Sequence, residues 1–103
     1  MVATVCTGAM LATAAGLTKG RPAVTHRGAI DDLRTAGAEV IEARVVDDGD
    51  LVTAGGVTSG IDMALWLVER HFGAELADAV AAEIEHPRSG EVWRATPGRG
   101  PAR

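Results

Sequence analysis

Short apolar runs alternate along the chain with segments whose apolar residues recur at helical spacing. The runs are too short for helices and predict four strands, at residues 2–5, 23–25, 40–46 and 51–54. The segments with helical spacing predict four helices, at residues 7–15, 29–36, 58–72 and 75–85. Strands that alternate with helices favour an α/β fold with a mainly parallel sheet.

Turn-forming residues stand at the ends of these elements. Gly16, Gly37 and Gly73 follow three of the helices, and Pro87 stops the last one. The sequence Asp-Asp-Gly-Asp at residues 47–50 predicts a tight turn, because Asp and Gly tolerate turn conformations well. The strands on either side of this turn are therefore expected to pair as a hairpin.

The two C-terminal helices are expected to be amphipathic. In helix 58–72, a stripe of apolar residues is predicted to face the core: Ile61, Leu65, Val68 and Phe72. Trp66 lies off this stripe, and Asp62 follows Ser59 at the spacing of a capping box. In helix 75–85, the predicted inner face consists of Leu76, Val80 and Ile84.

Composition limits the class of protein. The chain has 103 residues, of which 47% are hydrophobic and 23% charged, which fits one small globular domain and excludes a disordered chain. The single cysteine excludes a disulfide scaffold, and no apolar run is long enough to cross a membrane. Alanine contributes 19 residues and aromatic residues 3%, so large side chains for a core are scarce.

The charge is divided unevenly along the chain. Residues 1–87 carry 6 Lys or Arg against 13 Asp or Glu, a net of −7, whereas residues 88–103 carry 4 Arg against 1 Glu, a net of +3. The acidic part argues against nucleic-acid binding, which needs a basic surface. The Arg-, Pro- and Gly-rich segment 88–103 predicts a flexible, solvated tail. The start of the chain lacks a basic signal-peptide region, so the expected location is the cytoplasm.

Cys6 is the candidate for reactive chemistry, because it lies between a predicted strand and a predicted helix of small residues. A nucleophile elbow has this arrangement, and its sharp turn needs small neighbours such as Gly8 and Ala9. The start of the helix directs N–H groups at the sulfur, where they favour a thiolate and can hold an oxyanion. The alternative is a small buried apolar residue, and spacing alone leaves both interpretations open.

Two ordered blocks of the sequence resemble the ThiJ/PfpI family, within the class I glutamine amidotransferase-like superfamily. The first block comprises residues 5–9, 15–17, 19–21 and 24–26, and the second comprises residues 47–62. The most similar branch is the isonitrile hydratase-like one, which also provides the sensor domains of some AraC-type transcriptional regulators.

The resemblance implies a flavodoxin-like three-layer α/β sandwich in which Cys6 is the nucleophile. Thr7 would supply a backbone N–H and a hydroxyl to the site, and His26 would lie close to Cys6 as its proton partner. Arg27 departs from the family, in which many members have an aromatic residue after this histidine. Because the family domain is considerably longer, residues 1–87 are expected to be its C-terminal half, without the half that supplies an acidic residue near the nucleophile.

Three functional hypotheses follow. The chain is a hydratase or hydrolase whose Cys6 attacks an electrophilic carbon such as that of an isonitrile, a sensor that binds a small ligand or reports oxidation of Cys6, or a truncated copy that is inactive alone. The expected partner is a small-molecule substrate or ligand, with no nucleic acid bound by this chain alone and no membrane, and a homodimer is left open. No cofactor or metal is expected: residues 55–60 lack the lysine of a phosphate loop, and His71 and His86 lack metal-ligand spacing with Cys6.

Overall fold

The computed structural model describes residues 1–88 and 92–95. The strands within these residues are β1 (Val2–Val5), β2 (Pro22–Ala23), β3 (Glu39–Val40), β4 (Val45–Asp47), β5 (Leu51–Ala54) and β6 (Val92–Arg94). The helices are α1 (Gly8–Ala14), α2 (Ile30–Thr35), α3 (Ser59–Phe72) and α4 (Ala74–Glu83). A 3-10 turn at Arg27–Ala29 leads into α2. The predicted alternation of strands and helices is therefore confirmed.

The main sheet has the strand order β1-β5-β4-β6. β1 is parallel to β5, and β6 is parallel to β4, while β4 and β5 form the predicted antiparallel hairpin. β2 and β3 pair in parallel as a separate small sheet. The prediction of a mainly parallel sheet is thus confirmed, with the hairpin as the antiparallel part.

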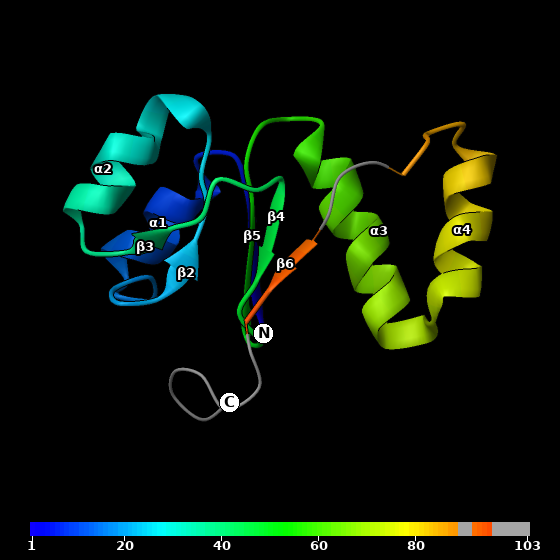
Figure 1. The fold of residues 1–103 in the computed structure, drawn as a ribbon, viewed down its shortest axis with the longest axis horizontal. Helices are drawn as coiled ribbons and strands as arrows, with labels where there is room; N and C mark the ends of the chain where they lie inside the picture. The colour runs from blue at the N-terminus through cyan, green and yellow to red at the C-terminus, as the bar shows by residue number, and fades with distance from the viewer. Residues whose placement is uncertain (89–91, 96–103) are drawn as a thin grey trace.

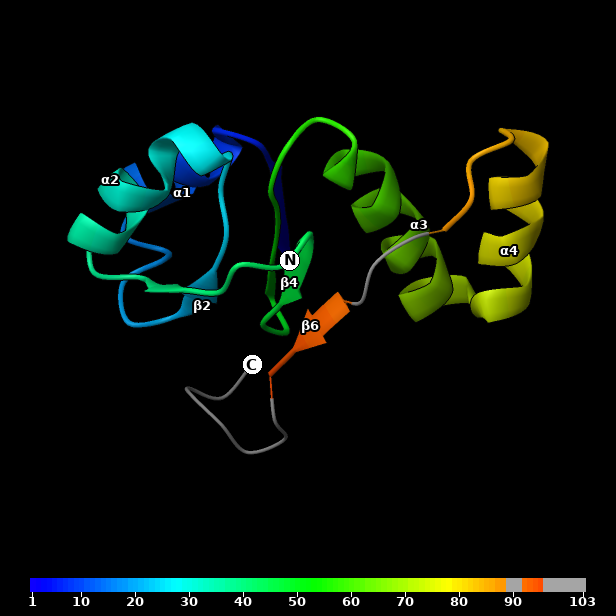
Figure 2. The same ribbon diagram turned by 45° about the horizontal axis from the view of Figure 1, so that its top comes forward.

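The helices lie on the two sides of the main sheet. Figure 1 shows α1 and α2 with the small sheet on one side and α3 on the other. α4 packs against α3 on the side away from the sheet, as the turned view also shows (Figure 2). The chain folds as α/β layers, and the connections that leave β1, β2 and β5 all run along the same end of the sheet (Figure 1).

Two apolar clusters hold these layers together. One lies between the main sheet and α3 and contains Val45, Val52, Ala54, Met63 and Trp66. The other joins α2 to the small sheet and contains Ala23, Leu33 and Ala38, with Met10 and Val40 packed against it. Because alanines occupy several of these positions, neighbouring elements pack closely despite the shortage of large side chains.

The prediction of one strand over residues 40–46 is wrong. β3 ends at Val40 and β4 begins at Val45, so the chain leaves the small sheet and crosses to the main one between them. The crossing segment is held by backbone hydrogen bonds: Ile41 N–H donates to Ala23 O (3.0 Å), and Arg44 O accepts from Gly55 N–H (3.1 Å). Apolar β-branched residues on both sides of the crossing had concealed it.

The predicted buried face of α3 is only partly correct. Leu65 is buried, but Ile61 is 39% and Phe72 73% exposed, whereas Met63 and Trp66 are buried. α3 is covered by the sheet and by α4, so its buried surface is wider than one stripe and is centred elsewhere. Trp66 can be buried at little cost because its indole N–H donates to Asp47 (Nε1 to Oδ2, 2.7 Å).

The predicted inner face of α4 is wrong in the same way. Leu76 is 46% and Ile84 53% exposed, and Val80 is half-buried. The buried positions are Ala77 and Ala81. Small side chains at these positions allow α4 to lie close against α3, which outweighs the burial of larger apolar residues at other positions.

The capping box predicted for Ser59 and Asp62 does not form. Thr58 is the N-cap residue of α3, and its side chain makes no capping hydrogen bond. The buried carboxylate of Asp62 instead accepts from Arg44 Nε (2.8 Å) and lies 3.1 Å from His86 Nε2. A charged partner from the segment between β3 and β4 has replaced the local interaction.

The predicted tail, residues 88–103, falls mostly outside the described residues, which omit 89–91 and 96–103. At the described positions the structure differs from a solvated extension. Arg88 bridges Glu69 of α3 (2.8 Å) and Asp78 of α4 (3.0 Å), and β6 pairs with β4. The hydrogen bonds that Arg88 donates to Glu69, and then to Asp78, raise the pKa of Arg88 above its ordinary value.

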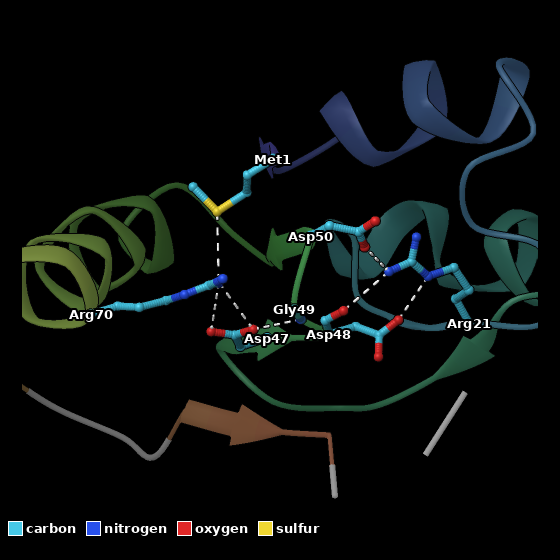
Figure 3. A network of polar contacts seen from close by, with 7 residues as sticks. All are labelled: Met1, Arg21, Asp47, Asp48, Gly49, Asp50 and Arg70. Carbon is cyan, nitrogen blue, oxygen red and sulfur yellow. Dashed lines mark hydrogen bonds and ion pairs between the residues drawn. The ribbon is translucent and has the colours of Figure 1, made fainter. Parts of the chain in front are cut away.

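A polar network anchors the turn of the β4–β5 hairpin (Figure 3). On one side Asp47 accepts from Arg70 NH1 (3.2 Å). On the other side Arg21 binds Asp48 (Nε to Oδ2, 2.7 Å) and also Asp50. Burial acts to lower the pKa of Arg21, but the hydrogen bonds and charges of Asp50 and Asp48 outweigh it, so the pKa is raised. The hairpin is therefore tied both to α3 and to the chain segment before β2.

Candidate active site around Cys6

Cys6 lies in the sharp connection between β1 and α1, where a nucleophile elbow was predicted. Its φ of 58° is in the left-handed region, which non-glycine residues rarely adopt. Two hydrogen bonds hold this backbone: Cys6 N–H donates to Ala54 O (3.0 Å), and Cys6 O accepts from Thr25 Oγ1 (2.9 Å). The thiol is free and half-buried. A strained, well-held backbone that presents a reactive side chain is typical of functional sites.

Thr7 directly follows Cys6 and occupies the N-cap position of α1. Its backbone is helical (φ −75°, ψ −1°), and its carbonyl accepts from Met10 N–H (2.9 Å). The exposed side chain makes no capping hydrogen bond. Its hydroxyl is thus available to a ligand, as are the amide groups that a first helical turn leaves without intrahelical acceptors.

His26 follows Thr25, the residue that hydrogen-bonds Cys6. It is half-buried, and its Nδ1 accepts from Gly28 N–H (3.1 Å). A neutral imidazole whose Nδ1 accepts must carry its proton on Nε2, so this ring is set up to donate from Nε2. Within residues 1–88 the hydrogen bond of His26 goes to Gly28 and not to the Cys6 thiol, and the link between His26 and Cys6 runs through Thr25.

Thr25 is a site residue to which sequence reasoning assigned no role. It is buried, and its hydroxyl holds the carbonyl of a residue 19 positions earlier in the chain. The pairing depends on how two distant segments pack, so spacing could not reveal it. The only signal was a strand-favouring Thr directly before the candidate histidine.

The first turn of α3 also approaches the elbow closely. A Cβ at Gly60 would lie 2.9 Å from Cγ1 of Val5, the residue before Cys6. Glycine at this position allows the helix to pack against the end of β1.

Gly60→Ala is therefore expected to destabilise the fold by about 1 kcal/mol, although alanine normally favours a helix over glycine, because overpacking outweighs propensity. Gly56→Ala is the matched control, since a Cβ there meets nothing within 4 Å. Thermal unfolding of both variants measures the difference. A Gly60→Ala variant as stable as Gly56→Ala would contradict the close approach.

A groove of about 310 Å³ opens beside the elbow. It reaches Thr25, which holds the Cys6 carbonyl, and Gly55, which follows the acceptor of the Cys6 N–H. Its other lining residues are Val24, Arg27, Ile30, Glu42, Ala43, Arg44, Gly56 and Ser59. None of the predicted site residues Cys6, Thr7 and His26 lines this groove, which adjoins the elbow through Thr25 and Gly55.

Among the described residues, no group of three or more His, Cys, Asp or Glu could hold a metal ion. Over the same residues, no helix is long and apolar enough to cross a membrane.

The fold and site together define an α/β protein with a cysteine at a strand-to-helix elbow. The chain belongs to the DJ-1/PfpI family, whose model matches residues 1–70. It is 45% identical to the isonitrile hydratase of Pseudomonas putida over 85 residues. These aligned residues are 82% of this chain and 37% of the hydratase. It is 42% identical over 53 residues to deglycase PfpI of Pyrococcus furiosus, covering 52% of this chain and 32% of that protein.

Among solved structures, a ThiJ/PfpI family protein from Pseudomonas syringae superposes with a TM-score of 0.78 at 36% identity, over 84% of this chain and 36% of that one. The predicted family and its flavodoxin-like fold are thus confirmed. The chain spans somewhat more than a third of the length of the hydratase and of this solved relative.

Proposed function

We propose that Cys6 is a nucleophile toward a small electrophilic molecule, in a hydratase of the isonitrile hydratase type. The observation that carries the proposal is the Cys6 backbone, held at a φ of 58° by Ala54 and Thr25 at the end of a strand. The similarity to an isonitrile hydratase supports the choice of reaction. The proposal places this chemistry in the cytoplasm, on a small-molecule substrate.

In the proposed reaction, the Cys6 thiolate forms an S–C bond to the terminal carbon of an isonitrile. The carbon takes up a proton, so that the adduct is a thioimidate with an S–CH=N linkage. Water then adds to the same carbon, the nitrogen takes up a proton, and the C–S bond breaks. The products are a formamide and the regenerated thiol, so that one water is consumed for each isonitrile.

Two neighbours have roles in this proposal. His26, with its Nε2 proton, suits donation to the substrate, since its Nδ1 is occupied by Gly28. The backbone N–H and the hydroxyl of Thr7, which makes no capping hydrogen bond, can stabilise the charge that develops on the substrate. Both assignments concern proton transfer and charge, whereas Cys6 alone forms the covalent bond.

The test uses the fact that the chain has one cysteine, so every alkylation event reports Cys6. The folded chain is expected to react with iodoacetamide at neutral pH about tenfold or more faster than the same chain in concentrated urea. Cyclohexyl isonitrile should be converted to its formamide, detected by mass spectrometry, and Cys6→Ser should abolish the conversion. Equal alkylation rates in the folded and unfolded chain would refute an activated nucleophile. Fast alkylation without formamide would refute the hydration and favour the sensor hypothesis.

A further inference from the structure

The groove beside Cys6 carries two arginines with unused hydrogen-bond donors. Arg27 is exposed, and no polar partner of its guanidinium is found among residues 1–88 and 92–95. Arg44 donates from Nε to Asp62 and from Nη2 to both Asp62 and Thr58, and within the same residues its Nη1 has no partner. Such donors suit planar anions, because a guanidinium matches the geometry of a carboxylate.

Arg44 is held in position before any ligand arrives. Its Nη2 lies 2.7 Å from Oδ2 of Asp62, whose side chain is 7% exposed. Asp62 is itself fixed from the other side by His86 (3.1 Å). Because the guanidinium is already ordered, a ligand that binds it loses little side-chain entropy.

Arg27 supplies the positive charge that is not already neutralised. Asp62 largely neutralises the charge of Arg44. The net charge of the groove therefore depends on Arg27 and on Glu42, the acidic residue in its lining. Arg27 directly follows His26, the candidate proton donor. Glu42 is exposed, and its negative charge repels an anion. Removing the charge of Arg27 and removing that of Glu42 should therefore change anion binding in opposite directions.

We propose that this groove is a subsite for a carboxylate group of the molecule that reacts with Cys6, bound by Arg27 and by the free Nη1 of Arg44. This inference rests on the proposed role of Cys6 as a nucleophile and names the class of its substrate: small anionic electrophiles. The Cys6 side chain does not line the groove, but Thr25 and Gly55 do, and Thr25 holds the Cys6 carbonyl. The proposal therefore requires that a carboxylate in the groove leaves the electrophilic carbon of the same molecule within reach of the thiol.

The test compares two alkylating agents that differ in charge. Iodoacetate and iodoacetamide both form an S–C bond and release iodide, but only iodoacetate carries a carboxylate. The ratio of their rate constants cancels the amount of thiolate and isolates the contribution of the groove. Arg27→Gln is expected to lower the iodoacetate-to-iodoacetamide ratio about three- to tenfold, and Glu42→Gln should raise it by a similar factor. Added salt should weaken both effects, because both residues are exposed.

Arg34→Gln is the matched control, since Arg34 is an exposed arginine on α2 that pairs with Asp31 outside the groove (3.2 Å). Its ratio should equal that of the unchanged chain. If Arg27→Gln gives the same ratio as Arg34→Gln, the subsite is refuted. A slow reaction with iodoacetamide alone would count against Cys6 activation and not against the groove, so the two proposals fail separately.

Discussion

Asp47→Ala is expected to lower the free energy of unfolding by about 2–4 kcal/mol. Asp47 is 6% exposed, and its carboxylate accepts hydrogen bonds from three donors: Trp66 Nε1 (2.7 Å), Gly49 N–H (2.8 Å) and Arg70 Nη1, which lies 3.3 and 3.2 Å from the two carboxylate oxygens. Figure 3 shows the contacts with Gly49 and Arg70. Alanine leaves the buried indole N–H without an acceptor and removes the counter-charge of Arg70. Such a loss is a large share of the about 5–15 kcal/mol by which domains are stable.

Thermal unfolding followed by circular dichroism measures this effect, which should appear as a decrease in Tm of roughly 10–25 °C for a domain of this size. Asp31→Ala is the control, since Asp31 is 98% exposed and pairs with Arg34 on the surface; its Tm should change little. Asp47→Asn should fall between the two, because an amide oxygen still accepts from Trp66 or Gly49 while the charge is lost. Equal Tm values for Asp47→Ala and Asp31→Ala would show that the network contributes nothing.

This network also shows which parts of the fold the sequence could predict. The turn at residues 47–50 was visible because Asp and Gly are local turn signals, and Gly49 indeed has a φ of 85°. The arginines that bind the turn, Arg21 and Arg70, come from segments 27 and 23 positions away from their partners. Side-chain pairs of that separation leave no periodic pattern, so only the fold reveals them.

The same distinction explains the errors in the helices. A 3.6-residue period identifies a helix, but not how many neighbours cover it. α3 has the sheet on one side and α4 on another, so Trp66 is buried although it lies off the apolar stripe, and Phe72 on the stripe is 73% exposed. Asp62 was assigned to a local cap because its ion pair with Arg44 spans 18 positions.

The candidate site was predictable to a similar extent. Cys6 and its strand-to-helix setting follow from neighbouring residues, and the elbow forms where expected. The roles of Thr7 and His26 came from the family resemblance, and they stay predictions. Thr25 holds the elbow and lines the groove, and Arg44 lines the groove. Both residues come from segments far from Cys6 in the sequence, so only the structure could place them.

Cys6→Gly is expected to combine a complete loss of thiol chemistry with a gain in stability. A non-glycine residue in the left-handed region costs roughly 1–2 kcal/mol. Glycine avoids this cost because it has no Cβ, but it also makes the unfolded chain more flexible, which cancels part of the gain in stability. Cys6→Ala removes the thiol but keeps a Cβ at a φ of 58°. The glycine variant should therefore be more stable than the alanine variant by about 1 kcal/mol, measured by urea unfolding.

Glu85 provides the matched comparison, because it is exposed and has a φ of 55° just after α4. Glu85→Gly should give a similar gain in stability over Glu85→Ala while leaving the alkylation rate of Cys6 unchanged. If glycine is more stable than alanine at both positions, the left-handed backbone is strained at Cys6 and at Glu85 alike. Only the strained backbone at Cys6 would then carry a reactive side chain. A Cys6→Gly variant no more stable than Cys6→Ala would mean that Ala54 and Thr25 hold the turn without strain, and that the elbow positions the thiol by hydrogen bonding alone.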